Sequence, residues 1–254
     1  MKHTIVITGA GSGLGRGLSQ HLAAAGHHIL VTDLRLESAE ETVQLIKAEG
    51  HSAEAHALDV SSETEVEKFW QAHEETPVSV LINNAGLQQV SSIDEFPIDK
   101  WDLIHNVLLR GTFLMSRAAL PGMKKRGLGR IVHIGSIHSL VASPGKAAYV
   151  SAKHALLGFS KVLALETAAS DITSNTICPA YIHTPLVDKQ IKDQAKVRGI
   201  SEAEVIEKVM LAPMPKKSFI SIEEIVAATE YLISPLARNL TAQTLTLDGG
   251  WTAQ

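Results

Sequence analysis

The chain has 254 residues, of which 45% are hydrophobic and 20% are charged, and its formal net charge is −4. This composition is ordinary for a globular protein, and the weak negative charge gives no general attraction to nucleic acid or to an anionic membrane. No apolar run approaches the length of a membrane span, and a strand-like segment follows Met1-Lys2-His3 directly, so we expect no signal peptide. The single cysteine, Cys178, excludes an intramolecular disulfide and fits a reducing compartment, which favours a cytoplasmic protein.

Short β-branched runs alternate with longer segments of helical pattern along the chain. Strands are predicted, in chain order, at Thr4–Thr8, Ile29–Thr32, Ala53–Ala57, Val78–Asn83, Arg130–Ile134, Thr173–Cys178 and Thr244–Leu247. Helices are predicted between them near Leu14–Ala25, Leu36–Glu49, Glu63–Glu75, Lys100–Arg126, Ala147–Ala169 and Ile222–Ile233. Apolar strands that alternate with helices indicate a parallel sheet covered on both faces, with right-handed crossovers. We predict one doubly wound α/β domain over residues 1–254.

The segment Pro185–Pro215 interrupts this alternation. It is charged, has a helical pattern and lies between the sixth predicted strand and the last helix. Long insertions in compact domains often form lids or binding loops, so we predict a substrate lid at about residues 185–215. The charged residues from Asp188 to Glu207 are interpreted as a solvated helix face.

A glycine-rich stretch, Thr8-Gly9-Ala10-Gly11-Ser12-Gly13-Leu14-Gly15, follows the first strand and opens the first helix. Glycines in this context allow the backbone to turn tightly and to approach a pyrophosphate, while the helix N-terminus supplies amide donors and positive potential. A tight strand–helix turn needs glycine in any case, so the motif alone is weak evidence. We predict cofactor contacts from Gly9, Ser12, Gly13, Leu14 and Gly15.

Asp33 ends the second strand, where the loop of such a fold reaches the adenosine ribose. A carboxylate at this point accepts hydrogen bonds from both ribose hydroxyls and repels a 2′-phosphate, which favours NAD over NADP. The alternative is that Asp33 caps the next helix. Arg16 and Arg35 are interpreted as solvated helix residues rather than as ligands of a 2′-phosphate.

Other loops at the carboxyl ends of strands should also face the cofactor, because ligands bind there in open α/β sheets. Asp59-Val60 follows the third strand, although Asp59 could instead cap the next helix. Asn83-Asn84-Ala85-Gly86 follows the fourth strand and is a plausible turn when taken alone. The cofactor contacts predicted here are Asp59, Val60, Asn84 and Gly86, with Pro179, Ile182 and Thr184 after the sixth strand.

The candidate catalytic residues are Ser136, Tyr149 and Lys153. Ser136 follows the fifth strand, and Tyr149 and Lys153 stand four residues apart on the next predicted helix. Oxidation of an alcohol requires a base that titrates near the working pH, whereas a free tyrosine has a pKa of about 10. We expect the lysine ammonium to stabilise the phenolate and to lower the pKa of Tyr149. Ser136 can hold the substrate oxygen against the phenol.

These motifs together, T-G-A-G-S-G-L-G, N-N-A-G and Ser136 with Y-V-S-A-K, resemble the short-chain dehydrogenases/reductases. The resemblance extends from the first strand to Asp248-Gly249-Gly250. It implies a Rossmann fold of seven parallel strands and usually a homotetramer. It also implies that Ser136, Tyr149 and Lys153 are catalytic, and that Tyr149 and Lys153 contact the cofactor, with Lys153 on the nicotinamide ribose.

One position departs from the family pattern. The long helix of the family carries an asparagine in W-D-x-x-x-x-x-N-L-x-G-x-F, and this asparagine helps to hold a water that connects the catalytic lysine to solvent. Trp101-Asp102 and Gly111-Thr112-Phe113 fit that pattern here, but the asparagine position is Leu108. Asn106 lies two residues away and would point to another side of the helix. We expect activity nonetheless, with a changed proton relay, if a backbone carbonyl at a helix kink holds the water.

Several segments resemble one branch of the family, the bacterial 3-hydroxybutyrate dehydrogenases: N-N-A-G-L-Q, S-I-H-S-L-V-A-S-P-G-K-A-A-Y, T-P-L-V-D-K-Q-I and D-G-G-W-T-A-Q. The resemblance implies that Gln88, His138, Lys146 and Gln190 hold the substrate carboxylate and neighbouring groups. A small hydroxy acid needs such a set, a cation with neutral donors. Each residue alone would be unremarkable on a surface or in a turn.

Two aromatic residues complete the predicted substrate site. Trp251 is expected either to seal a small pocket or to pack at a subunit contact. Tyr181 stands where this branch usually has tryptophan after Pro-Gly, so the pocket keeps an aromatic wall but gains a hydroxyl. Ser136 and Tyr149 are expected to take the hydroxyl end of the substrate.

The sequence therefore predicts an enzyme that oxidises (R)-3-hydroxybutyrate reversibly to acetoacetate with NAD, with Tyr149 as the general base. The expected partner is a small 3-hydroxy acid, with no nucleic acid, membrane or bound metal involved. The alternatives are a dehydrogenase of another hydroxy acid or of a sugar, a reductase of 3-oxoacyl thioesters, and a non-catalytic dinucleotide-binding protein. Asp33 argues against the NADPH-dependent reductases, and the carboxylate-binding set argues against a neutral sugar.

Overall fold

The computed structural model describes residues 2–253, apart from the side chains of residues 185, 186, 189, 190, 193 and 197. Its centre is a parallel sheet of seven strands in the order β3-β2-β1-β4-β5-β6-β7. The strands are β1 (Thr4–Ile7), β2 (His28–Asp33), β3 (Ala53–Ala57), β4 (Val78–Asn83), β5 (Leu128–Ile134), β6 (Asp171–Pro179) and β7 (Thr244–Leu247). Each lies within about two residues of its predicted bounds, and the doubly wound, single-domain Rossmann fold is confirmed.

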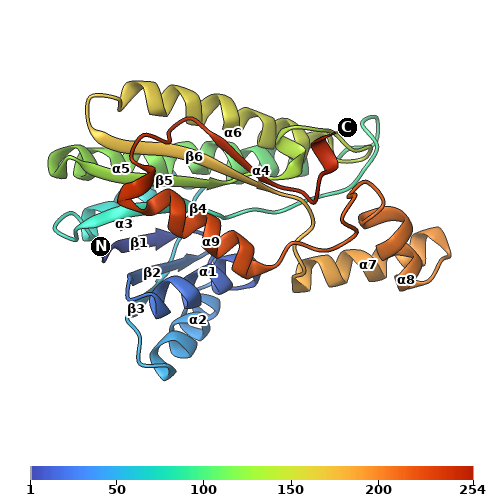
Figure 1. Cartoon of the computed structure of the whole chain (residues 1–254), viewed down its shortest axis with the longest axis horizontal. Helices are drawn as coiled ribbons and strands as arrows, with labels where there is room; N and C mark the ends of the chain where they lie inside the picture. The colour runs from blue at the N-terminus through green and yellow to red at the C-terminus, as the bar shows by residue number, and fades with distance from the viewer. Residues whose placement is uncertain (1, 254) are drawn as a thin grey trace.

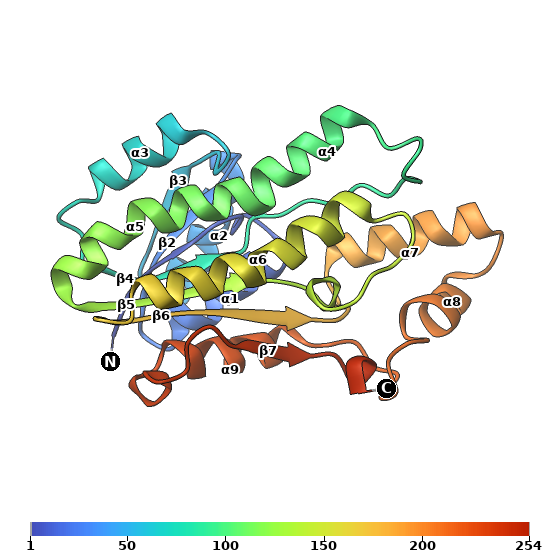
Figure 2. The same cartoon turned by 90° about the horizontal axis from the view of Figure 1, so that it is seen from above.

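Helices cover both faces of the sheet (Figures 1 and 2). One layer consists of α1 (Gly13–Ala24), α2 (Leu36–Ala48) and α9 (Ile222–Ile233), and the other of α3 (Glu63–Ala72), α4 (Ile98–His105), α5 (Thr112–Arg126) and α6 (Ala147–Glu166). Two apolar cores, one on each face, pack strand side chains such as Ile5 and Val6 against these layers. The central strands β1 and β4 are mainly apolar because both of their faces are buried.

The strand order reverses between β1 and β4, which is the switch point at which ligands bind in such sheets. All strands are parallel, so the loops that follow β1, β4, β5 and β6 meet at one edge. The fold therefore brings the glycine-rich stretch, Asn84, Ser136 and Pro179 to the same rim, although they lie far apart in the chain.

The helix predicted near Lys100–Arg126 is present and runs from Ile98 to Arg126, but a π-helical turn at Asn106–Gly111 divides it into α4 and α5. At this turn the helix comes very close to the loop after β3: a Cβ on Gly111 would lie 2.8 Å from Cγ2 of Val60. Leu108 is buried against α6, whereas Asn106 is exposed, so the two residues face different sides as expected. The helix is irregular at Leu108, where the family pattern has asparagine.

The segment predicted as a lid contains α7 (Pro185–Arg198), α8 (Glu202–Val205) and a second π-helical turn at Ile206–Met210. Val187, Ile191, Val205 and Met210 form a small apolar core between them. Figure 2 shows α7 and α8 beyond the carboxyl ends of the strands, on the side of the predicted site. Among the described residues, we find no helix with the length and apolar character that crossing a bilayer requires.

Candidate active site

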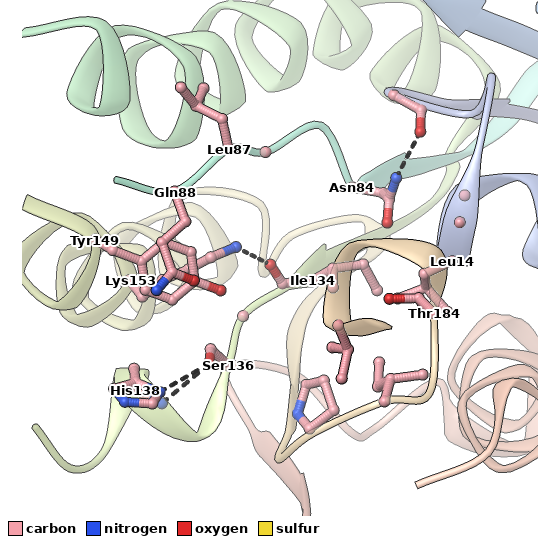
Figure 3. A pocket seen from close by; sticks show the side chains of 18 of the residues that line it. Leu14, Asn84, Leu87, Gln88, Ile134, Ser136, His138, Tyr149, Lys153 and Thr184 are labelled. Carbon is pink, nitrogen blue, oxygen red and sulfur yellow. Dashed lines mark hydrogen bonds between the residues drawn. The ribbon is translucent and has the colours of Figure 1, made fainter. Parts of the chain in front are cut away.

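A cavity of about 340 Å³ lies at the carboxyl ends of the strands (Figure 3). Most of the predicted site residues line it: Gly9, Ser12, Gly13, Leu14, Gly15, Asp33, Asn84, Gly86, Gln88, Ser136, His138, Lys146, Tyr149, Lys153, Pro179, Tyr181, Ile182 and Thr184. These residues come from the loops after β1, β4, β5 and β6, from the end of β2, and from α1 and α6. The fold therefore gathers the predicted cofactor and substrate residues around one space.

Asn84 holds the glycine-rich loop in place. Its side-chain amide donates to the carbonyl oxygens of Thr8 at 2.8 Å and Gly9 at 3.0 Å. Gly9 has a φ of +62°, and a Cβ there would lie 2.7 Å from Cα of Ala85, so only glycine fits. Gly13, at the start of α1, lines the cavity and has no atom within 4 Å of the position a Cβ would take.

The start of α1 is suited to a pyrophosphate. The N-cap residue, Ser12, makes no side-chain cap hydrogen bond, so its hydroxyl leaves the first amides of α1 to other acceptors. These amides and the helix dipole favour a negatively charged group. A dinucleotide therefore fits the loop in charge as well as in shape.

Asp33 reaches the cavity from the end of β2. Its carboxylate accepts hydrogen bonds from the backbone amides of Gly11 at 3.0 Å and Arg35 at 3.1 Å. It does not cap α2, whose N-cap residue is Arg35. The guanidinium of Arg16 is paired with Glu41 at 2.9 Å and also donates to the carbonyl oxygen of Gly11 and to the Thr42 hydroxyl. The end of β2 therefore presents a carboxylate, which accepts hydrogen bonds and would repel a phosphate.

Tyr149 and Lys153 lie on one face of α6. The ammonium of Lys153 donates to the carbonyl oxygen of Ile134 at 2.5 Å and lies 5.6 Å from the centre of the Tyr149 ring (Figure 3). Burial lowers the pKa of Lys153 to about 8. Burial also raises the pKa of Tyr149, and a hydrogen bond with Ser136 acts in the opposite direction. The expected lowering of the tyrosine pKa is therefore wrong for the protein alone, because desolvation of the phenolate outweighs its neighbours.

Ser136 and His138 form a short turn after β5. The Ser136 hydroxyl accepts from the backbone amide of His138 at 3.1 Å, and the imidazole Nε2 contacts the Ser143 hydroxyl at 2.9 Å. Burial, followed by the charge of Lys146, lowers the pKa of His138 to about 4. His138 is therefore a neutral hydrogen-bonding group at physiological pH.

The substrate side of the cavity combines a cation, an amide and aromatic rings. The ammonium of Lys146 lies 5.5 Å from the centre of the Tyr181 ring. Trp251 does not line the cavity, but its ring stacks on Tyr181 at 6.2 Å and meets His138 edge-on at 6.0 Å. Nε2 of Gln88 is buried and has no hydrogen-bond partner among the described residues. The side chain of Gln190, the remaining predicted substrate contact, lies outside the described residues.

Similar proteins identify the chain's family. A family model described as short chain dehydrogenase matches residues 3–195. The chain belongs to this family. It is 42% identical to a D-beta-hydroxybutyrate dehydrogenase of Rhizobium meliloti over the full length of both chains, and 38% identical to that of Cupriavidus necator over 99% of this chain and 98% of the other. It is also similar to a solved actinorhodin polyketide ketoreductase with NADPH, at a TM-score of 0.94 and 30% identity, covering 100% of this chain and 98% of the other.

The short-chain dehydrogenase is therefore an oxidoreductase with a dinucleotide-binding Rossmann fold.

Two predicted cofactor contacts are placed differently from the rest. Asp59 does not line the cavity, and its carboxylate accepts from the backbone amide and the hydroxyl of Ser61 at 2.8 and 2.7 Å. Val60 is buried against Gly111. Asp59 does not cap α3 either, because the N-cap residue of that helix is Ser62, so both roles considered for Asp59 give way to a local turn with Ser61.

The sequence reasoning also missed some residues of the cavity wall. These are Leu87, Ile134, Gly135, Ile137, Ala180 and Val187. Each lies within three residues of a predicted residue in the chain, and Ile134 is the last residue of β5, two residues before Ser136. Their positions near the carboxyl ends of strands could have indicated that they line the cavity, whereas their apolar or small side chains indicate no particular chemistry.

Proposed function

We propose that this short-chain dehydrogenase oxidises (R)-3-hydroxybutyrate reversibly to acetoacetate with NAD as the cofactor. The observation that carries the proposal is Gln88, which lines the same cavity as Lys146, Ser136 and Tyr149 and whose buried amide nitrogen has no hydrogen-bond partner among the described residues. A buried donor without a partner is unfavourable unless a ligand accepts from it. The relatives named for D-beta-hydroxybutyrate support a small hydroxy acid as that ligand.

The reacting end of the substrate belongs to Ser136 and Tyr149. The Ser136 hydroxyl holds the substrate oxygen, and Tyr149 removes the hydroxyl proton as a phenolate. Burial raises the pKa of Tyr149 in the protein alone, so the phenolate would need the positive charge of bound NAD in addition to that of Lys153. NAD, when bound, supplies the hydride acceptor, and the residues that would hold it are the α1 N-terminus, Asp33, Asn84 and Lys153. The Ile134 carbonyl holds Lys153 in place, so its positive charge is available to stabilise the phenolate.

The carboxylate end of the substrate belongs to Lys146 and Gln88. The partly buried ammonium of Lys146 neutralises the carboxylate, and Gln88 donates a hydrogen bond to it. Neutral His138 and Tyr181 form the wall between the two ends, and the Trp251 ring packs against both of them. This arrangement selects a hydroxy acid over a neutral alcohol of the same shape. With a neutral alcohol bound, the Lys146 ammonium would have no carboxylate to pair with.

The remaining features of the proposal concern the surroundings of the site. We propose that residues 185–215, which include Val187 of the cavity wall, act as the substrate lid and exclude water on closing. We also propose a cytoplasmic homotetramer. Large apolar side chains exposed on α5 and α6, Phe113, Val162 and Leu165, support self-association.

The decisive experiment measures NADH formation from NAD and each enantiomer of 3-hydroxybutyrate, with NADP and butan-2-ol in parallel. We expect NAD-selective turnover of the (R)-acid and little turnover of the neutral alcohol. Tyr149→Phe should abolish turnover while NADH binding persists, and Tyr181→Phe, which keeps the general base, should remain active. Preferred reduction of a 3-oxoacyl thioester with NADPH, or equal rates with the acid and butan-2-ol, would overturn the proposal.

A further inference from the structure

A cluster of metal-binding side chains lies outside the active site, at the edge of the sheet. Glu54 and His56 lie on β3, the edge strand, and His73 caps the C-terminus of α3. One potential ligand atom from each side chain lies within 4.8 Å of the others. Residues two apart on a strand point to the same face, which is why Glu54 and His56 meet. None of the three lines the active-site cavity.

The contacts of the two histidines leave a ligand nitrogen available on each. Nδ1 of His73 contacts the carbonyl oxygen of Phe69 at 2.7 Å, and because a carbonyl only accepts, Nδ1 carries the proton. Nε2 of His73 therefore carries the lone pair. A backbone carbonyl that fixes the tautomer in this way is a typical outer partner of a metal-bound histidine. Nε2 of His56 is buried and has no hydrogen-bond partner among the described residues.

The carboxylate of Glu54 completes the set. One oxygen lies 3.8 Å from Nε2 of His56, and the other lies 3.4 Å from Nε2 of His28. Two ligands bound to one tetrahedral Zn²⁺ at about 2.0–2.1 Å lie roughly 3.4 Å apart. The observed spacing therefore needs only small side-chain movements to accept an ion. His28, which also contacts the Ser52 hydroxyl at 2.7 Å, is placed to orient the carboxylate.

We propose that Glu54, His56 and His73 bind one Zn²⁺ or a similar transition-metal ion that ties the edge strand β3 to the end of α3. Two imidazoles and one carboxylate suit Zn²⁺, with water in the fourth position, and are too nitrogen-rich for Mg²⁺ or Ca²⁺. The ion would cross-link β3 and α3 and cover part of the sheet edge. Its role is structural, and it does not depend on the substrate assigned above.

The test is calorimetric titration of the metal-free full-length protein with zinc chloride, and in parallel with magnesium chloride. We expect one equivalent of zinc and no magnesium. Glu54→Gln, an exposed substitution that preserves shape, and His73→Ala should each weaken zinc binding by at least about tenfold. Zinc should also raise the thermal midpoint of the wild-type protein, and this rise should disappear in both variants.

The matched control is His21→Ala. Like Nδ1 of His73, Nδ1 of His21 contacts the carbonyl oxygen four residues earlier on its helix, that of Gly17, at 2.9 Å. Nε2 of His21 lies 3.9 Å from the Glu223 carboxylate, but among the described residues His21 belongs to no group of three metal-binding side chains. Zinc binding should be unchanged in this variant. Absence of saturable binding to the wild-type protein, or equal affinity in Glu54→Gln, His73→Ala and the wild type, would overturn the proposal. Cobalt bound in place of zinc should give the absorption of a four- or five-coordinate ion in the wild type and in His21→Ala, but not in Glu54→Gln or His73→Ala.

Discussion

Replacing Gln88 by leucine should stabilise the free enzyme and impair its activity at the same time. Nε2 of Gln88 is buried and has no partner within the described part of the chain, and a buried donor left without a partner costs a protein roughly 1–3 kcal/mol. Leucine has nearly the same volume and no donor, so part of that cost is removed. A gain of about 1 kcal/mol would raise the thermal midpoint of a chain of this size by roughly 2–4 °C.

The effect on activity has the opposite sign. A hydrogen bond to a carboxylate contributes about 1.5–3 kcal/mol, which corresponds to a decrease in kcat/KM of about tenfold to 150-fold. Gln88 binds the end of the substrate that does not react, so its contribution is equal in ground and transition states, and the change should appear in KM rather than in kcat.

The assay combines thermal unfolding of the free enzyme with steady-state kinetics on (R)-3-hydroxybutyrate. Gln89→Leu is the matched control, because Gln89 is exposed and its amide donates to the Val90 carbonyl of the next residue at 3.5 Å. This variant should leave both the midpoint and KM unchanged. A lower midpoint with an unchanged KM in Gln88→Leu would refute the reasoning, since Gln88 would then be a packing residue.

Two further predictions concern Asp33 and buried histidines. Asp33→Asn keeps an acceptor for the Gly11 amide but removes the negative charge. The ratio of kcat/KM with NAD to kcat/KM with NADP should therefore fall roughly tenfold or more. An unchanged ratio would mean that other groups select the cofactor. The pKa values of His3 and His138 are lowered to about 4 and that of His133 to about 3, mainly by burial. The unfolded chain then binds more protons below its ordinary histidine pKa of about 6.5, so stability should fall as pH falls from 6.5 towards 4, by up to about 1.4 kcal/mol per pH unit for each histidine. Chemical denaturation at several pH values should give a shallower slope for His133→Gln, and an equal slope would contradict the assignment.

The sequence was sufficient to predict the sheet and the rim of the site, because both depend on local patterns. Apolar strands between helices specify a parallel sheet, and its geometry brings Gly9, Asn84 and Ser136 together without any knowledge of their contacts. The π-helical turn beside Leu108 could not be predicted, since it depends on the close approach of Gly111 to Val60, which is a tertiary contact.

The direction of pKa shifts in the site could not be predicted from the sequence either. Spacing placed Tyr149 and Lys153 on one helix face, but the direction of the tyrosine pKa depends on how deeply the phenol is buried. The same holds for the grouping of Glu54 and His56 with His73, which are separated by a loop and most of a helix. Such contacts between distant segments become visible only when the layers are packed.

The bonds from Asn84 to the glycine-rich loop have a kinetic consequence. Both loop carbonyls are already engaged with the Asn84 amide, so the loop is held in its binding shape before any dinucleotide arrives. Ordering a free loop would cost about 1–2 kcal/mol per residue, and this cost is avoided here. Association should therefore be limited by diffusion and orientation, and substitutions around the pyrophosphate site should change the residence time of the dinucleotide far more than its rate of arrival.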